Sequence, residues 1–201
     1  MQAVALATED ALSEAVGQRL IAAVGGGLTV TQTLRKRGSG YLKSSMRKFC
    51  ELARRMPVLL ITDLDSEECP STLIENWARR DAIPDQLSFG VAVRQVESWL
   101  LGDAEGLARF LSISARRLPR DPDSLPNAKH VLLRLAQGAP RAIRDELVAE
   151  PGAIAAQGLG YNEVLSEFVR KKWNPAAAAT RSDSLARARR RLADMALQAG
   201  R

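Results

Sequence analysis

The residues best suited to chemistry are two aspartates that follow a short, mostly apolar run. The run is PVLLIT, residues 57–62, and Asp63 and Asp65 come directly after it, one residue apart. If the chain stays extended through residue 65, both carboxylates lie on one face and Leu64 points away. Carboxylates are unfavourable beside an apolar core unless a cation or hydrogen-bond donors compensate them. The pattern therefore indicates a metal site, or alternatively aspartates that only hold a turn or cap the next helix.

Two further acids follow other apolar segments. Glu9 comes after the first segment of the chain, and Glu97 comes shortly after the fourth. Ligands of an open parallel sheet bind at the carboxyl ends of its strands, so we expect these acids to converge with Asp63 and Asp65. Converging carboxylates repel each other unless a cation lies between them. Mg²⁺ (or Mn²⁺) suits such a site because it takes a few carboxylates and leaves room for phosphate oxygens.

Each of these acids also has a purely structural interpretation. Glu9 and Asp10 could simply favour the positive end of the first helix, with Thr8 as its N-cap. Asp103 is more simply the N-cap of the segment AEGLARFL than a catalytic group. A metal site is favoured by the coincidence of a glutamate after the first strand with a D-x-D after the third.

The hydrophobic periodicity predicts the elements that position these acids. Alternating or continuous apolar runs predict strands, and 3.6-residue spacing predicts helices between them. Strands are expected at 3–8, 28–35, 58–62 and 86–94, and helices at 9–24, 42–56 and 71–80. This β-α-β-α-β-α-β order predicts an α/β fold with a four-stranded, mostly parallel sheet flanked by helices.

The character of the chain changes after residue 94. Only helical patterns follow, at 95–111, 127–137, parts of 140–150, 161–173 and 182–199, with a proline-rich linker at 118–126. We therefore expect an α/β catalytic core over residues 1–94 and an all-helical C-terminal half with a basic tail over residues 95–201.

These features together resemble the TOPRIM family, the metal-dependent catalytic fold of topoisomerases, bacterial primases and overcoming-lysogenization-defect nucleases. The resemblance rests on Glu9 after the first strand, on DLD at 63–65 after the third, and on the strand order over residues 3–94. The segments VRQVESWLLGD (93–103) and SDSLARARRRL (182–192) resemble small bacterial TOPRIM-like proteins. Those proteins are often encoded beside an AAA or ABC-type ATPase, in apparent phage-defence arrangements.

The resemblance implies roles for three residues. Glu9 would be a metal ligand or a general acid/base, and Asp63 and Asp65 would hold Mg²⁺. One position departs from the family, because Asp10 stands where a glycine usually follows the glutamate. The chain lacks the other domains that topoisomerase chemistry requires. The resemblance therefore implies a Mg²⁺-dependent nuclease acting on DNA or RNA, partnered with an ATPase in defence.

The charge pattern predicts a partner that carries phosphate or other acidic groups. The net charge is +6, and residues 181–201 hold six arginines and two aspartates, a local net charge of +4. Arginine-rich surfaces suit phosphate, so we expect this tail to bind nucleic acid or a partner rather than to join the core. The alternative is a solvated helix face. The candidate nucleic-acid-binding residues are Arg94, Lys171, Lys172, Arg187, Arg189, Arg190 and Arg191.

Two other functions compete with the nuclease hypothesis. A TOPRIM-like scaffold could serve as a non-enzymatic binding subunit of an ATPase complex. A haloacid-dehalogenase-type phosphatase would use the first aspartate of the D-x-D as a nucleophile. That motif normally follows the first strand, whereas here 62 residues precede it. A homo-oligomer is compatible with all three functions.

The N-terminal segment, the lengths of the apolar runs and the cysteine count predict where the protein is located in the cell. The N-terminal segment lacks the basic region of a secretion signal, and no apolar run approaches the ~20 residues that span a bilayer. Cys50 and Cys69 are too few for a disulfide framework, so we expect small apolar residues in a reducing compartment. His130, the single histidine, is expected to be structural or solvent-facing. These observations predict a cytoplasmic protein that does not associate with membranes.

Overall fold

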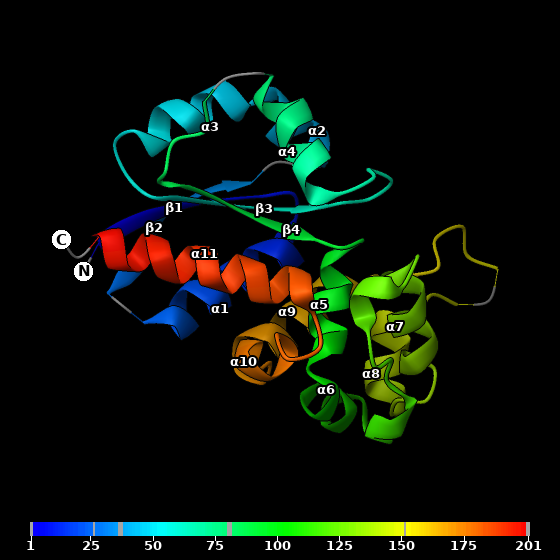
Figure 1. Cartoon of the computed structure of the whole chain (residues 1–201). Helices are drawn as coiled ribbons and strands as arrows, with labels where there is room; N and C mark the ends of the chain where they lie inside the picture. Colours follow the sequence, from blue (N-terminus) through cyan, green and yellow to red (C-terminus); the bar gives the residue numbers. More distant parts are fainter. Residues whose placement is uncertain (1, 26, 36–37, 80–81, 151, 200–201) are drawn as a thin grey trace.

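The computed structural model of the chain describes residues 2–25, 27–35, 38–79, 82–150 and 152–199 (Figure 1). Arg80, at the end of the expected 71–80 helix, lies outside the described residues. The four strands form one all-parallel sheet in the order β2-β1-β3-β4, which confirms the predicted α/β class. The strands are β1 (Gln2–Thr8), β2 (Leu28–Arg35), β3 (Val58–Asp63) and β4 (Leu87–Ala92).

The helices between the strands largely follow the predicted positions. They are α1 (Ala11–Val24), α2 (Ser39–Ser44), α3 (Met46–Ala53) and α4 (Pro70–Ala78). The single helix expected at 42–56 is wrong, because Ser45 interrupts it with φ −98° and ψ 3° and separates α2 from α3. Helix α1 begins after Asp10, whose side chain accepts a hydrogen bond from the Ser13 N–H at 2.8 Å. Asp10 is therefore the N-cap, in place of Thr8.

The region after β4 is helical, as predicted. It contains α5 (Val96–Gly102), α6 (Ala104–Leu111), α7 (Ala128–Ala136), α8 (Arg141–Leu147), α9 (Tyr161–Lys171), α10 (Pro175–Ala178) and α11 (Asp183–Ala199). Two short 3-10 turns, Ala115–Arg117 and Pro122–Ser124, connect α6 to α7. The single helix expected at 95–111 is two helices that meet at Asp103. Asp103 caps α6 by accepting the Gly106 N–H at 3.0 Å, as its position predicts.

Alternation along the inner strands divides the core into two layers. In β1, Val4 and Leu6 face one layer and Ala5 and Ala7 face the other. In Figure 1, α2, α3 and α4 cover one face of the sheet, while α1, α9 and α11 lie on the opposite side. A parallel sheet that is buried on both faces needs such continuous apolar strands, which is why β1 and β3 have polar residues only at their ends.

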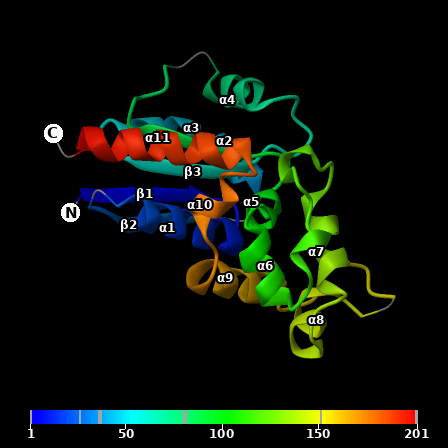
Figure 2. The same ribbon diagram turned by 60° about the horizontal axis from the view of Figure 1, so that its bottom comes forward.

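The helical half does not form a core of its own. The layer that contains α1 also contains Trp99 of α5, Phe168 of α9 and Leu185 of α11, all of them buried. Figures 1 and 2 both place α5, α6, α7 and α8 together at one end of the sheet. The change at residue 94 is therefore a change of composition, across which one apolar core continues.

The packing of α11 contradicts the expectation that the basic tail does not join the core. Leu185, Ala188, Leu192 and Met195 of α11 are buried in the shared core, so the helix is part of the fold rather than an appendage. Its arginines at 187, 190 and 191 are exposed on the outer side. Within the described residues, none of the helices has the length and apolar character needed to cross a membrane.

Candidate metal site at the carboxyl edge of the sheet

Glu9 and Asp63 meet where the neighbouring strands β1 and β3 end. The Thr62 hydroxyl donates a hydrogen bond to Glu9 Oε1 at 2.5 Å, and the Asp63 N–H donates to the same oxygen at 3.1 Å. Since β1 and β3 are parallel neighbours, the residues that follow them emerge side by side. The structure thus brings together two of the predicted site residues, and both bonds use the same oxygen of Glu9.

Asp63 in turn holds the start of α5. Its Oδ1 accepts the Val96 N–H at 2.8 Å, so the carboxylate satisfies one of the free amides of the first helical turn. A negative charge is also favourable at this positive end of the helix. One oxygen of Asp63 is fixed in this way by the backbone of the element that follows β4.

Glu97 lies in the first turn of α5 and is almost completely buried, with 5% of its surface exposed. The buried hydroxyl of Tyr161, on α9, donates a hydrogen bond to Glu97 Oε1 at 2.7 Å. Lys129 of α7 lies over the Tyr161 ring, with its Nζ 4.8 Å from the ring centroid. The candidate ligand from the fourth strand end is therefore held by Tyr161 of α9, whose ring is in turn covered by Lys129 of α7.

Asp65 differs from the expected geometry. β3 ends at Asp63, and Asp65 adopts a left-handed conformation with φ of 50°, so the premise of an extended chain through residue 65 is wrong. The Asp65 side chain is exposed, whereas Leu64 is buried as expected. Arg94 holds this turn by donating from Nη1 to the carbonyls of Asp65, at 3.1 Å, and Glu67, at 2.6 Å.

The acids nevertheless act on one another electrostatically. Burial raises the pKa of Asp63 well above its ordinary value, and the neighbouring charges of Glu97, Glu9 and Asp65 raise it further. Burial also raises the pKa of Glu9, against the hydrogen bonds from Thr62 and Asp63, which lower it. The pKa of Glu97 is raised by burial and lowered by the Tyr161 hydroxyl and by Lys129. The carboxylates therefore strain one another when they are all ionised, and Lys129 is the cation that acts on Glu97.

The donor set suits a hard, partly hydrated cation. Carboxylate oxygens are the ligands that Mg²⁺ prefers, and Mg²⁺ usually keeps several waters and takes only one or two carboxylates besides substrate phosphates. Among the described residues, no three His, Cys, Asp or Glu side chains are grouped closely enough to hold an ion by themselves. The residues fit such a hydrated Mg²⁺ but not a cage of protein ligands alone. The assignment of all four acids as direct ligands stays a prediction.

A small hollow lies beside the acids on the α2 and α4 side of the sheet. Its volume is about 210 Å³, and its lining includes Asp63, Asp65, Trp77 and the exposed Lys43 of α2. Sequence reasoning missed Lys43, Thr62 and Tyr161, because none stands in a recognisable motif. Lys43 is the cationic side chain of this lining, so it is available to a substrate phosphate.

The candidate nucleic-acid-binding residues fall into separate groups. Arg94 binds backbone carbonyls, and Lys171 pairs with Glu167 at 2.6 Å. Lys172 Nζ lies 5.6 Å from the centroid of the Phe110 ring. On α11, Arg189 and Arg190 line a hollow of about 370 Å³ against α10, and Arg189 Nε is buried with no acceptor among the described residues.

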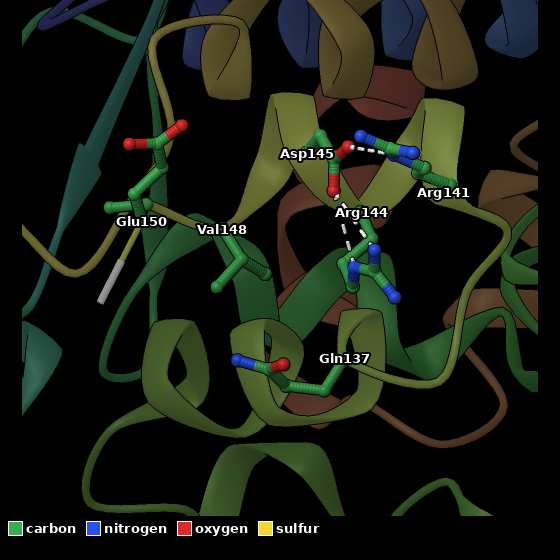
Figure 3. Close-up of a pocket in the computed structure, with 7 residues that line it drawn as sticks. Gln137, Arg141, Arg144, Asp145, Val148 and Glu150 are labelled. Carbon is green, nitrogen blue, oxygen red and sulfur yellow. Dashed lines mark hydrogen bonds and ion pairs between the residues drawn. The ribbon is translucent and has the colours of Figure 1, made fainter.

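Another hollow is remote from these acids in its lining. It has a volume of about 650 Å³ and is formed around α8, with Asp145 bonded to both Arg141 and Arg144 (Figure 3). Because Asp145 already pairs with both guanidinium groups, the hollow has little free positive charge. It contains none of the predicted site residues.

Comparison with known proteins gave no relative. No family model, no curated protein and no solved structure matches the chain. The resemblance to the TOPRIM family therefore stays a prediction, carried by Glu9, by Asp63 and Asp65, and by the strand order.

Proposed function

We propose that the protein is a Mg²⁺-dependent nuclease that hydrolyses phosphodiester bonds of DNA or RNA. The observation that carries this proposal is the hydrogen bond from the Asp63 N–H to Glu9, together with the charges of Glu97 and Asp65, which are near enough to raise the pKa of Asp63 further. Carboxylates that repel one another favour binding of a cation from solution.

Each residue of the proposed site would have its own role in such a reaction. When bound, Mg²⁺ would activate a water molecule and stabilise the leaving oxygen in an in-line displacement. Glu9 and Asp63 each keep one oxygen in a hydrogen bond to the protein, which fixes their orientation and leaves the other oxygen for the ion or its waters. Glu9 is also placed to accept a proton from the attacking water. Lys43 would contact a substrate phosphate in the adjacent hollow.

The basic helix supports a nucleic-acid substrate. Arg187, Arg190 and Arg191 of α11 are exposed, so their guanidinium groups are available to backbone phosphates. Phosphate contacts of this kind position a nucleic acid without reading its sequence. We therefore propose a substrate that is recognised through its backbone.

Cleavage assays on the purified chain test this function. Labelled single- and double-stranded DNA and RNA are incubated with Mg²⁺, Mn²⁺ or EDTA. We expect metal-dependent cleavage by the wild type and none by Asp63→Asn or Glu9→Gln, which keep the acceptor oxygens but remove the charges. Asp121→Asn, at an exposed position away from the proposed site residues, is the matched control and should cleave normally.

The outcomes also separate the competing functions. Tight nucleic-acid binding without cleavage under any metal would replace the nuclease with a binding subunit. Hydrolysis of a chromogenic phosphate monoester, but not of nucleic acid, would instead indicate a phosphatase. An ATPase partner, a defence role, a homo-oligomer and a cytoplasmic location stay predictions. Co-purification with the product of a neighbouring ATPase gene and light scattering of the pure chain would test the partner and the oligomer.

A further inference from the structure

The hydrogen bond between Tyr161 and Glu97 joins the helical half of the chain to the acids at the sheet edge. Tyr161 is 1% exposed and Glu97 is 5% exposed, so the contact is closed to solvent. The two residues lie 64 positions apart, on α9 and α5, and their oxygens are 2.7 Å apart. A buried carboxylate is strongly unfavourable without donors, and here a phenol from a distant helix supplies one.

In this arrangement the Tyr161 hydroxyl is the donor of the hydrogen bond and the Glu97 carboxylate is the acceptor. Burial and the neighbouring Glu97 carboxylate raise the pKa of Tyr161, so its hydroxyl stays protonated and acts as the donor. Lys129, packed on the Tyr161 ring, adds positive charge on the same side of Glu97. Glu97 is therefore held through Oε1 by Tyr161 of α9, and the charge of Lys129 on α7 acts on it without a direct bond.

The position of Glu97 at the start of α5 links the Tyr161–Glu97 hydrogen bond to Asp63. Val96, the residue before Glu97, donates its N–H to Asp63, so the two carboxylates are anchored at adjacent residues of one helical turn. The Glu97 charge is also the largest of the neighbouring charges that act on Asp63. Partners that hold metal ligands from behind fix their orientation and raise their affinity for the ion.

We infer that Tyr161 is a positioning residue that orients Glu97 toward Asp63, so that the helical half completes the cation site of the sheet. This inference rests on the proposed function, since it assigns a role in the same site. The alternative is a Tyr161–Glu97 pair that only stabilises the core, and Mn²⁺ affinity distinguishes the two.

Metal titrations of the full-length chain test the inference. Mn²⁺ is titrated calorimetrically into wild type, Tyr161→Phe, Glu97→Gln and Ser166→Ala. Ser166 is the matched control, because it is also buried on α9 and loses one hydroxyl, here bonded to the Ala11 carbonyl at 3.4 Å. We expect Mn²⁺ affinity to fall by about 10–100-fold in Tyr161→Phe and in Glu97→Gln, and to stay within about twofold of wild type in Ser166→Ala.

Glu97→Gln keeps the inference testable if Tyr161→Phe does not fold. Glutamine can still accept the Tyr161 hydroxyl, so this variant preserves the hydrogen bond and removes only the charge. Folded Glu97→Gln or Tyr161→Phe protein that binds Mn²⁺ as tightly as wild type would overturn the inference. An equal loss of affinity in Ser166→Ala would also overturn it.

The same titration distinguishes failure of the inference from failure of the proposed function. If wild type binds Mn²⁺ and Asp63→Asn does not, the proposed site stands whatever Tyr161→Phe shows. If wild type binds no Mn²⁺, the proposed function and the inference fall together. A double variant, Glu97→Gln with Tyr161→Phe, should bind no more weakly than Glu97→Gln alone, because the hydroxyl then has no carboxylate to position.

Discussion

Replacing Asp63 by asparagine tests the electrostatic basis of the site before any activity is measured. Asparagine keeps an oxygen that can accept the Val96 N–H, so the start of α5 retains its hydrogen bond. The change removes a negative charge from the positive end of this helix, which costs roughly 0.3–1 kcal/mol. It also removes repulsion from Glu97, Glu9 and Asp65. Burial and these like charges together raise the pKa of Asp63 well above its ordinary value, so we expect the relief of burial and repulsion to outweigh the helix effect.

We therefore expect Asp63→Asn to melt at the wild-type temperature or above it in EDTA. Excess Mg²⁺ should stabilise the wild type by about 2.7 kcal/mol at a hundredfold excess over Kd. For a chain of 201 residues this corresponds to a rise in Tm of roughly 5–11 °C. The rise should largely disappear in Asp63→Asn and persist in Asp121→Asn. Differential scanning calorimetry in EDTA and in Mg²⁺ makes all of these comparisons.

The opposite result would refute the reasoning. A helix-capping aspartate stabilises its helix with or without metal, and its loss costs about 0.5–2 kcal/mol. If Asp63→Asn melts lower in EDTA and the wild-type Tm ignores Mg²⁺, then Asp63 is a cap. The proposed metal site would then fail, and the nuclease proposal with it.

The remaining predictions concern pH, the basic helix and a thiol. Because burial and like charges raise the pKa values of the site acids, the folded chain in EDTA binds more protons than the unfolded chain, so its stability falls as the pH rises above about 4. Mg²⁺ binds the deprotonated acids, so calorimetry should show the Tm gap between Mg²⁺ and EDTA widening from pH 5 to pH 8; a constant gap would contradict this. Changing Arg187, Arg190 and Arg191 to Gln should flatten the salt dependence of duplex-DNA binding by about 0.9 slope units per lost phosphate contact, measured by fluorescence anisotropy. Changing the exposed Arg47, Arg54 and Arg55 to Gln is the control and should leave the salt dependence of binding unchanged. Hydrogen bonds to neighbouring hydroxyls lower the pKa of Cys69 to about 7, so its alkylation by iodoacetamide, followed by mass spectrometry, should have a midpoint near pH 7; a midpoint above pH 8 would contradict it.

The sheet and the pairing of Glu9 with Asp63 were predictable because they depend on local patterns. Each strand is a short apolar run between turn residues, and alternating strands and helices leave few topologies. Once β1 and β3 are parallel neighbours, the residues that follow them must meet. The strand order and the place of these two acids therefore follow from periodicity and chain connectivity.

Other features depend on contacts that no local pattern contains. Asp65 adopts a left-handed conformation, which the local sequence LDS does not predict. Arg94, which follows β4, holds that turn through a hydrogen bond to the Asp65 carbonyl. Tyr161 reaches Glu97 across 64 positions of chain. Asp10, which departs from the family's glycine, is a helix cap whose charge also raises the pKa of Glu9. Such long-range partners of a buried polar group become visible only when the helices are packed.

One such contact links the acids to the basic helix. Trp99 of α5, two residues after Glu97, donates its indole N–H to the Ser184 hydroxyl of α11 at 2.7 Å. The start of α11 is itself fixed, because Asp123 accepts the Ser184 N–H and the Ser182 hydroxyl, each at 2.8 Å. Helix α11 also packs its apolar face into the core that contains α5. The arginines of α11 are therefore held on the same rigid framework as Glu97. Rigid placement of backbone contacts relative to reacting groups lowers the entropic cost of catalysis. The proposed metal site and the proposed nucleic-acid contacts of α11 therefore keep a fixed position relative to one another.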